Sequence, residues 1–449
     1  MVENKMGTMN MKKLIVTMSI PVMLSMLIQA LYNIVDSMFI AYYSSDGLTA
    51  VSLCYPVQMI IVAIACGTGV GVNSLLSRFL GEKEKNKANL VAMHGLFLAL
   101  CNGIVFAVVG YGCAKQFLSY FSDNQSIINM GVSYMRICTL FSFGVFVQIT
   151  YERIMQSTGN TVYNMIIQSV GAIINIILDP VFIFGYFGLP SLGVTGAAIA
   201  TVTGQIIAML LGIIITQTRI KEIELSFQDW KLHKNILKQI YRVGFPAIVM
   251  QSIMSFMTVF MNVILIPFST LAVTVLSIYY KLQQFIFMAV SGMTNALIPI
   301  IAYNYGADHK KRIREAIGFS LLLSAGIMLL GTVAFEMFPV ELLYLFDAQE
   351  NMLSIGIPAL RIISISFVFA GISMVICAIF QAIDQANDSL FITLLRQLII
   401  LLPLTWLFGQ NFGLNMCWWA FPITELICAI ISLYRLKIIQ KQKICIDHL

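Results

Sequence analysis

Long apolar runs, separated by short polar stretches, recur along the whole chain. Residues 96–113, 165–189 and 197–217 are almost free of charged side chains. Because a helix needs about 20 apolar residues to cross the hydrocarbon core of a bilayer, this pattern predicts membrane-spanning α-helices. Twelve spans are expected, near residues 14–42, 50–79, 89–114, 129–155, 162–187, 193–217, 240–267, 271–304, 314–338, 352–382, 388–409 and 414–436.

The composition also indicates a membrane protein. Hydrophobic residues make up 59% of the 449 positions, charged residues make up 11%, and the mean hydropathy is +0.87. A soluble protein has about 25% charged residues. The apolar run from Leu14 past Phe39 is too long for the core of a cleavable signal peptide, so it is interpreted as the first span. The nine cysteines show no Cys-x-x-Cys spacing and are expected to pack as small apolar residues.

The distribution of Lys and Arg predicts the orientation of the spans. With the N-terminus placed in the cytoplasm, only Lys115 of the 27 basic residues falls in an outer loop, and Arg136, Lys281, Arg361 and Arg396 fall within helices. The other basic residues lie in inner loops or near the termini, as the positive-inside rule requires. Both termini are therefore expected on the cytoplasmic side. The net charge of +6 follows this face and forms no separate patch, so no nucleic-acid partner is expected.

An internal repeat relates the two halves of the chain. At an offset of 225 residues, proline, glycine and polar positions coincide. The matched pairs include Pro21 with Pro246, Tyr55 with Tyr280, Gly67 with Gly292, Arg136 with Arg361 and Gln156 with Gln381. Each half holds an even number of spans, so both halves enter the membrane in the same sense. The predicted fold is an all-α integral membrane protein with 12 transmembrane helices in two six-helix lobes, residues 1–218 and 242–449.

Residues 219–241 are predicted to form a cytoplasmic linker between the lobes. Its apolar residues suggest a helix on the membrane interface, namely Phe227, Trp230, Leu232, Ile236, Leu237 and Ile240. Two similar lobes joined by one linker can rock against each other, which is the architecture of alternating access, with the transport route between the lobes. A channel would more often be a symmetric oligomer, and this chain is expected to be monomeric.

Asp36 and Asp179 lie within predicted spans, where ionisable side chains are costly and are functional candidates by default. Gln29 and Asn33 share a helix face with Asp36, and Asn175 lies one turn before Asp179. Carboxylate and amide oxygens are hard ligands that could hold Na⁺, and the carboxylates could share a proton. At the repeat offset these positions are apolar, so the acidic site is not duplicated. The alternative role is interhelical hydrogen bonding that only stabilises the fold.

A transport route for hydrophobic cations needs aromatic and methionine side chains that can receive flat rings. The candidates for this route are Gln29, Tyr32, Asn33, Phe39, Tyr55, Glu152, Met257, Tyr279, Tyr280 and Gln283. Glu152 could instead form an interfacial ion pair with Arg153. Glu425, in the last span, could pair with Arg396 or Lys281, and its role stays open.

Three segments carry a family resemblance. They are Tyr32-Asn33-Ile34-Val35-Asp36, the run from Gln156 to Thr161 together with Asn175-Ile176-Ile177-Leu178-Asp179-Pro180, and the run from Gly193 to Thr201. Together they resemble the MATE family of multidrug and toxic compound extrusion transporters, and within it the bacterial DinF-type branch. The resemblance covers nearly the whole chain. It implies a coupling-cation site made by Asp36, Asn175, Asp179 and Thr201, with possible Na⁺ binding at Asp36 and Asp179.

The resemblance further implies export of small amphipathic cations, including drugs, by H⁺- or Na⁺-coupled antiport across the bacterial cytoplasmic membrane. No cofactor other than the coupling ion and no structural metal is expected. Another branch of the family places acidic residues in helices seven and ten. Here helix seven has Met261 and Asn262 without an acid, so a site of that second type is not expected.

Two other classes of protein fit the sequence less well. A flippase for lipid-linked oligosaccharides or peptidoglycan precursors shares the broader superfamily, but it typically has fourteen spans and would want a basic groove for pyrophosphate. A membrane enzyme would need a metal or nucleophile constellation. The four His residues are dispersed, without a His-Glu-x-x-His pattern, and no phosphate-binding Gly-x-x-x-x-Gly-Lys loop occurs. The chain is therefore predicted to be a transporter and not an enzyme.

Overall fold

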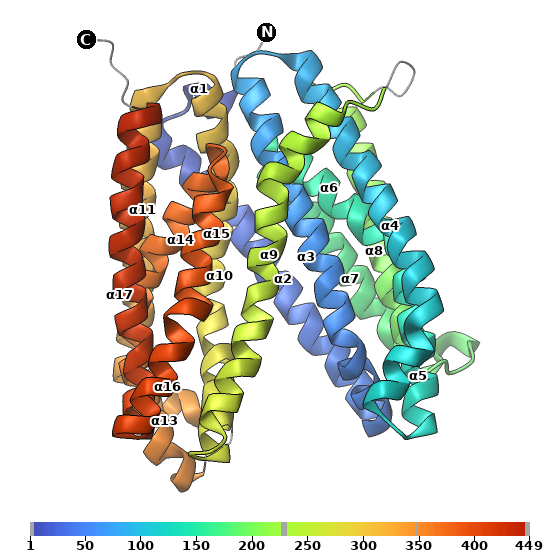
Figure 1. Ribbon diagram of the computed structural model, residues 1–449. Coiled ribbons are helices and arrows are strands. Elements are labelled where there is room, and N and C mark those ends of the chain that lie inside the picture. Colours follow the sequence, from blue (N-terminus) through green and yellow to red (C-terminus); the bar gives the residue numbers. More distant parts are fainter. Residues whose placement is uncertain (1–3, 226–230, 347–348, 445–449) are drawn as a thin grey trace. The chain divides into compact units, whose positions relative to one another are not determined.

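The computed structural model describes residues 4–225, 231–346 and 349–444, and every regular element within them is a helix (Figure 1). The helices are α1 (Lys5–Thr8), α2 (Met11–Tyr43), α3 (Ser45–Gly81), α4 (Lys85–Phe121), α5 (Gln125–Leu140), α6 (Phe143–Ser157), α7 (Thr161–Phe184), η1 (Tyr186–Gly188), α8 (Val194–Arg219), α9 (Lys234–Leu265), α10 (Thr270–Gly306), α11 (Lys310–Met337), α12 (Pro339–Tyr344), α13 (Glu350–Ser364), α14 (Phe367–Ala382), α15 (Ala386–Leu394), η2 (Leu395–Ile399), α16 (Leu401–Phe412), α17 (Leu414–Ile439) and η3 (Gln440–Ile444).

Within the described residues, ten helical segments are long and apolar enough to cross a membrane by themselves. Two further spans are broken helices. Helices α5 and α6 are bent by 45° against each other, and α13 and α14 by 47°. With each bent pair taken as one span there are 12, so the predicted all-α, twelve-span fold is confirmed.

The internal repeat extends to the backbone conformation. Moved along by 225 residues, α3 coincides with α10, and the bent pair α5–α6 falls on α13–α14. Residues with positive φ recur at the same offset: Lys83 (61°) with Asp308 (54°), Gly159 (88°) with Asp384 (63°), and Gly188 (83°) with Gly413 (84°). Only a few per cent of non-glycine residues adopt positive φ, so these matched positions show that the halves share their turn geometry as well as their helices.

The chain forms two compact units, and one of them combines residues from both ends of the chain. We call Leu24–Ile248 the N-terminal unit, and Met1–Met23 with Val249–Leu449 the C-terminal unit. Two segments lie in the other unit than the boundaries predicted from the sequence place them. Met1–Met23 belongs to the C-terminal unit, and the start of α9, up to Ile248, belongs to the N-terminal unit. We call these two the exchanged segments. The C-terminal unit is therefore built from two pieces of chain, whereas the N-terminal unit is one continuous segment.

The first residues are held in the C-terminal unit by their backbone. The side chain of Asn304, on α10, donates to the carbonyl oxygen of Met6 at 3.0 Å. The guanidinium of Arg312, on α11, donates to the carbonyls of Met6 and Met9 at 2.9 and 2.8 Å. Met6 is fully buried. These bonds attach α1 to the ends of α10 and α11.

The start of α9 is held in the N-terminal unit by close packing on α3. A Cβ added to Gly71 would overlap the carbonyl oxygen of Ile240, which shows how closely the two backbones approach. Ile236 and Ile240 are buried at 8% and 0% exposure in the core of this unit. Glycine in α3 therefore allows α9 to lie directly against it.

Of the predicted interfacial linker helix, only the last part is helical in the described residues. Residues 220–225 and 231–233 are not helical, and α9 starts only at Lys234. Ile236 and Ile240 pack inside the protein rather than on a membrane surface. Phe227 and Trp230 lie outside the described residues. Ile236 and Ile240 therefore bury the start of α9, whereas Leu232 is 50% exposed.

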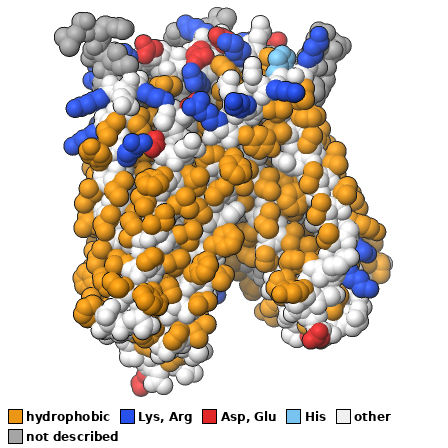
Figure 2. All heavy atoms as spheres, viewed as in Figure 1, with side chains coloured by type: hydrophobic (Ala, Val, Ile, Leu, Met, Phe, Trp, Pro, Cys, Tyr) orange, Lys and Arg blue, Asp and Glu red, His pale blue; other side chains and the backbone are white. Residues whose placement is uncertain are grey.

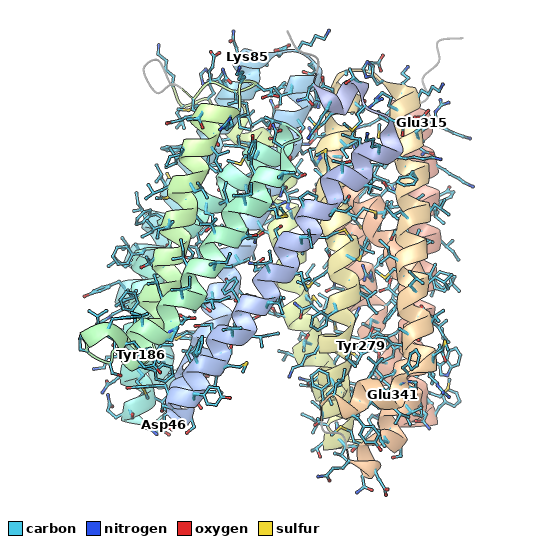
Figure 3. The ribbon with its side chains drawn as sticks, turned by 180° about the vertical axis from the view of Figure 1, so that it is seen from behind. Asp46, Lys85, Tyr186, Tyr279, Glu315 and Glu341 are labelled. Atoms are coloured by element: carbon cyan, nitrogen blue, oxygen red, sulfur yellow. The ribbon has the colours of Figure 1, made fainter. Side chains whose placement is uncertain are left out.

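Each unit has a polar end and apolar sides. On the face in Figure 2, Lys and Arg side chains gather at one end of each unit, and hydrophobic side chains cover the long sides. In the N-terminal unit, Lys85 lies at this basic end, and Asp46 and Tyr186 lie at the other (Figure 3). In the C-terminal unit, Glu315 and Glu341 lie at opposite ends. This polarity is that of a multi-pass membrane protein.

Candidate cation-coupling site

The site lies in the N-terminal unit where α2, α7 and α8 supply polar side chains. Helices α7 and α8 pack closely because glycines face each other: a Cβ on Gly204 would lie 2.7 Å from the carbonyl oxygen of Gly171 and 3.4 Å from the Cβ of Asn175. This approach brings Thr201, on α8, to Asn175, on α7. The local sequence thus places a hydroxyl beside the amide.

The Asn175 amide connects the polar groups of α7 and α8. Its Nδ2 donates to Asp179 Oδ1 at 3.4 Å and to Thr201 Oγ1 at 3.3 Å. Asn175 is 3% exposed and Asp179 is 0% exposed. Both bonds are long, so they orient the groups without fully satisfying the carboxylate. The structure brings Asn175, Asp179 and Thr201 together through these two bonds, and their role in cation binding stays a prediction.

Asp36, on α2, faces Asp179. The two carboxyl groups lie close enough for their charges to interact. Two ionised carboxylates at close range repel each other, so a proton or another cation between them is favourable. Within the described residues no Lys, Arg or His side chain forms an ion pair with either acid. The described part of the protein therefore provides no paired positive charge for these acids.

Three buried oxygens at this site have no hydrogen-bond partner among the described residues. They are Asp36 Oδ1, Asn175 Oδ1 and Asp179 Oδ2. A buried polar atom without a partner costs free energy, so each such atom needs an explanation, and a bound cation or water is one of them. All three are acceptors, and hard oxygen acceptors suit Na⁺ or a carboxyl proton. The residues present therefore fit a cation.

A chain of polar contacts leads from this pair along α2. The Tyr32 side chain, one turn before Asp36 on α2, lies close enough to interact with the charges of Asp36 and Asp179. Gln29 Oε1 accepts a bond from Gln168 Nε2 at 3.1 Å. Gln168 was not expected at the site. Its spacing of seven residues from Asn175 on α7 was the signal that could have identified it.

Glu152, on α6, lies inside the N-terminal unit rather than at a surface. It is 7% exposed and accepts a hydrogen bond from Gln148 Nε2 at 3.0 Å. The neighbouring Arg153 instead donates to Gln156 Oε1 at 3.0 Å. Tyr32 also interacts with the charge of Glu152, which makes Glu152 a third acid in this region.

The other predicted route residues have varied settings. In the N-terminal unit, the Phe39 ring is edge-on to Phe184 at 6.4 Å, Tyr55 is 55% exposed, and Asn33 is exposed. In the C-terminal unit, the Tyr280 hydroxyl donates to the Met257 sulfur at 3.2 Å, Gln283 is half-buried, and Tyr279 is 1% exposed within a cluster of aromatic rings.

The acid of the last span has a basic partner. Arg396 Nε lies 2.5 Å from Glu425 Oε1, and their side chains are only 16% and 12% exposed. Arg396 belongs to η2, a π-helical turn between α15 and α16. The Lys281 ammonium lies over the Phe346 ring instead, at 5.7 Å. Of the two partners that the sequence left open, the structure selects Arg396.

A family model described as MatE matches the chain twice, over residues 21–181 and 246–407. The two matches start at positions separated by the repeat offset, and together they cover more than half of the chain. The proteins named multidrug export protein MepA are similar in sequence. The one from Staphylococcus aureus strain MSSA476 is 25% identical over 92% of this chain and 91% of its own. The one from Staphylococcus haemolyticus is 26% identical over 93% and 91%.

Solved structures are similar along almost the entire chain. An outward-facing multidrug resistance MATE transporter of the MOP superfamily has a TM-score of 0.91 at 25% identity, covering 98% of this chain and 99% of that one. A MOP superfamily transporter from Pyrococcus furiosus has a TM-score of 0.89 at 27% identity, covering 98% of both. With a family match at both repeats and the same fold throughout, this chain belongs to the MatE family of membrane transporters.

Proposed function

We propose that this protein exports amphipathic organic cations in exchange for H⁺ or Na⁺, by alternating access. Support comes from its family and from relatives that are named multidrug export proteins. The positive-inside rule assigns the basic end of each unit, and with it both termini, to the cytoplasm. The protein acts in the bacterial cytoplasmic membrane, and it works as a monomer.

The observation that carries this proposal is the cluster of three unpartnered oxygens around Asp36 and Asp179. A proton bound to one carboxyl lets the other accept a hydrogen bond from it. A Na⁺ ion can contact oxygens of both carboxylates and of Asn175. Either cation replaces the positive charge that the protein itself does not supply. The site is thus built to bind and release one cation.

Release of that cation leaves two carboxylates facing each other in a low-dielectric interior, which is costly. An organic cation bound elsewhere in the protein can then offset this charge, so the two ligands favour different states of the transporter. Such linkage is reciprocal: each ligand lowers the affinity of the other by the same factor. Aromatic and methionine side chains such as Tyr32, Phe39 and Met257 suit hydrophobic cations.

The test uses everted membrane vesicles whose lumen is loaded with acid or with Na⁺. Wild type should accumulate a fluorescent cation under one of these gradients, which identifies the coupling ion. Asp36→Asn should abolish this accumulation, whereas Asp46→Asn, the same change in the first turn of α3, should not. Gradient-driven uptake by Asp36→Asn at the wild-type rate would refute the site. A preference for phosphorylated lipids over organic cations would support a flippase instead.

A further inference from the structure

A cavity of about 440 Å³ lies at the basic end of the N-terminal unit, away from the acid pair. Its walls come from the end of α3, the start of α4, and the start of α9 with the residue before it. The lining residues are Arg78, Phe79, Glu82, Lys87, Leu90, His233, Asn235, Ile236 and Gln239. Ligand pockets are typically about 300–1,000 Å³, so the cavity can admit a small headgroup.

The polar part of the lining is suited to an anion. The acid Glu82 already bonds to Arg78 Nε at 2.9 Å, so the net positive charge comes from Lys87. Lys87 lies over the Phe79 ring at 5.6 Å and pairs with Glu84. That pair is 51% and 43% exposed, and exposed pairs contribute only about 0–1 kcal/mol, so an anion can compete for the ammonium. Asn235 and Gln239, one turn apart on α9, add amide donors.

The α9 wall is fixed by His94. His94 is fully buried, and its Nδ1 lies 2.7 Å from the carbonyl oxygen of Leu90, which itself lines the cavity. The backbone N–H of His233 donates to its Nε2 at 2.9 Å. A carbonyl can only accept and a backbone N–H can only donate, so the ring is neutral with its proton on Nδ1. His94 therefore ties the residue before α9 to α4.

The residues before α9 have a second attachment to α4. Glu224 accepts from Lys85 at 2.5 Å, and its backbone N–H donates to Asn89 Oδ1 at 3.0 Å. These contacts hold the segment before α9 against α4, beside the cavity. The apolar part of its lining is formed by Phe79, Leu90 and Ile236.

We propose that this cavity binds the phosphoryl headgroup of an anionic phospholipid from the leaflet at the basic end. The phosphoryl oxygens accept from Lys87, Asn235 and Gln239, and the start of the acyl chains lies along the apolar wall. Phospholipid offers both the anion and the apolar chains that this lining requires, whereas a soluble phosphate offers only the anion. A lipid bound here holds the start of α9 against α3 and α4.

The test is lipid binding by the full-length protein in neutral detergent, followed by native mass spectrometry and by thermal unfolding. Phosphatidylglycerol should be retained over phosphatidylcholine and should raise Tm by about 5 °C. Lys87→Gln should reduce retention about fivefold, the effect expected for one basic residue near a membrane surface. Gln239→Leu should reduce it further when combined with Lys87→Gln. Lys87→Arg should retain binding, which separates loss of the site from misfolding.

Lys311→Gln removes the same charge at an exposed position of the C-terminal unit, and it should leave lipid retention unchanged. Equal retention of phosphatidylglycerol by wild type and the Lys87→Gln/Gln239→Leu variant would overturn the proposal. Inorganic phosphate tested alone should not raise Tm. If it reproduces the full shift, the lipid assignment is overturned in favour of a soluble phosphate. None of these measurements requires transport, so their outcome is independent of the proposed export function.

Discussion

Gly67, on α3, packs directly against the backbone of Ile248, on α9. A Cβ at residue 67 would lie 2.6 Å from the backbone nitrogen of Ile248 and 2.9 Å from its Cα. At the repeat offset, a Cβ on Gly292 would lie 2.8 Å from the Cα of Met23, on α2. Met23 and Ile248 are also related by this offset, and they are the last residues of the two exchanged segments. The same backbone contact therefore occurs once in each unit.

Replacing either glycine should destabilise the protein. For Gly67→Ala and Gly292→Ala, the new methyl group meets backbone rather than a flexible side-chain end, so we expect a loss of about 1–3 kcal/mol. Thermal unfolding in detergent should show a lower Tm. Gly112→Ala is the matched control, because nothing lies within 4 Å of its Cβ position in α4. It should be neutral or slightly stabilising, and an equal drop in Tm for Gly112→Ala would contradict the packing argument.

The acid pair should behave as one site. Asp36→Asn and Asp179→Asn should each abolish gradient-driven export while leaving membrane insertion intact. The double variant should be no worse than either single variant, since removing one carboxyl already destroys the shared cation site. Initial export rates in everted vesicles give the comparison. Partial coupling in each single variant, with losses that add in the double variant, would show two independent sites.

Thr201 should affect the affinity of the coupling cation more than the maximal rate. Thr201→Val removes the hydroxyl that accepts from Asn175, and a typical hydrogen bond contributes about 0.5–1.5 kcal/mol. We expect the concentration of H⁺ or Na⁺ that gives half-maximal export to rise about threefold to tenfold. Thr201→Ser keeps the hydroxyl and should restore the wild-type value. A fall in maximal rate alone would show that Thr201 has a different role.

The buried pair Arg396–Glu425 should be sensitive to removal of one partner. Arg396→Gln leaves the Glu425 carboxylate buried without its cation, which costs about 3–5 kcal/mol. The double variant Arg396→Met/Glu425→Gln removes both charges and should recover most of the loss in Tm. Equal destabilisation by the single and the double variant would show that shape, and not charge, makes this contact important.

The sequence predicted the helices well because apolar runs of bilayer length are a local signal. It missed the breaks at Phe141–Ser142 and Ile365–Ser366, because the apolar pattern continues through both turns. It also misassigned the apolar residues of the linker. Ile236 and Ile240 have the spacing of an interfacial helix, but the same spacing buries them against α3, and only tertiary packing separates these outcomes.

The candidate site was also partly predictable from local sequence patterns. Spacing within α7 placed Asn175 and Asp179 on one face. Asp36 shares with them an apolar counterpart in the second repeat, and this common feature grouped the three residues. The contact of Thr201 with Asn175 depends on the close approach of α7 and α8 at Gly171 and Gly204, which no pattern within a single helix reveals. The partner of Glu425 also required three-dimensional placement.

The exchanged segments constrain the order in which the two units can complete their folding during synthesis. Residues 24–219 leave the ribosome before residues 234–248, so the surface of α3 around Gly67 and Gly71 stays uncovered until the second repeat begins to be made. The first 23 residues, in contrast, are synthesised long before α10 and α11, which hold them. A chain cut in the linker would leave each fragment carrying a segment that completes the other, so neither half can finish folding by itself.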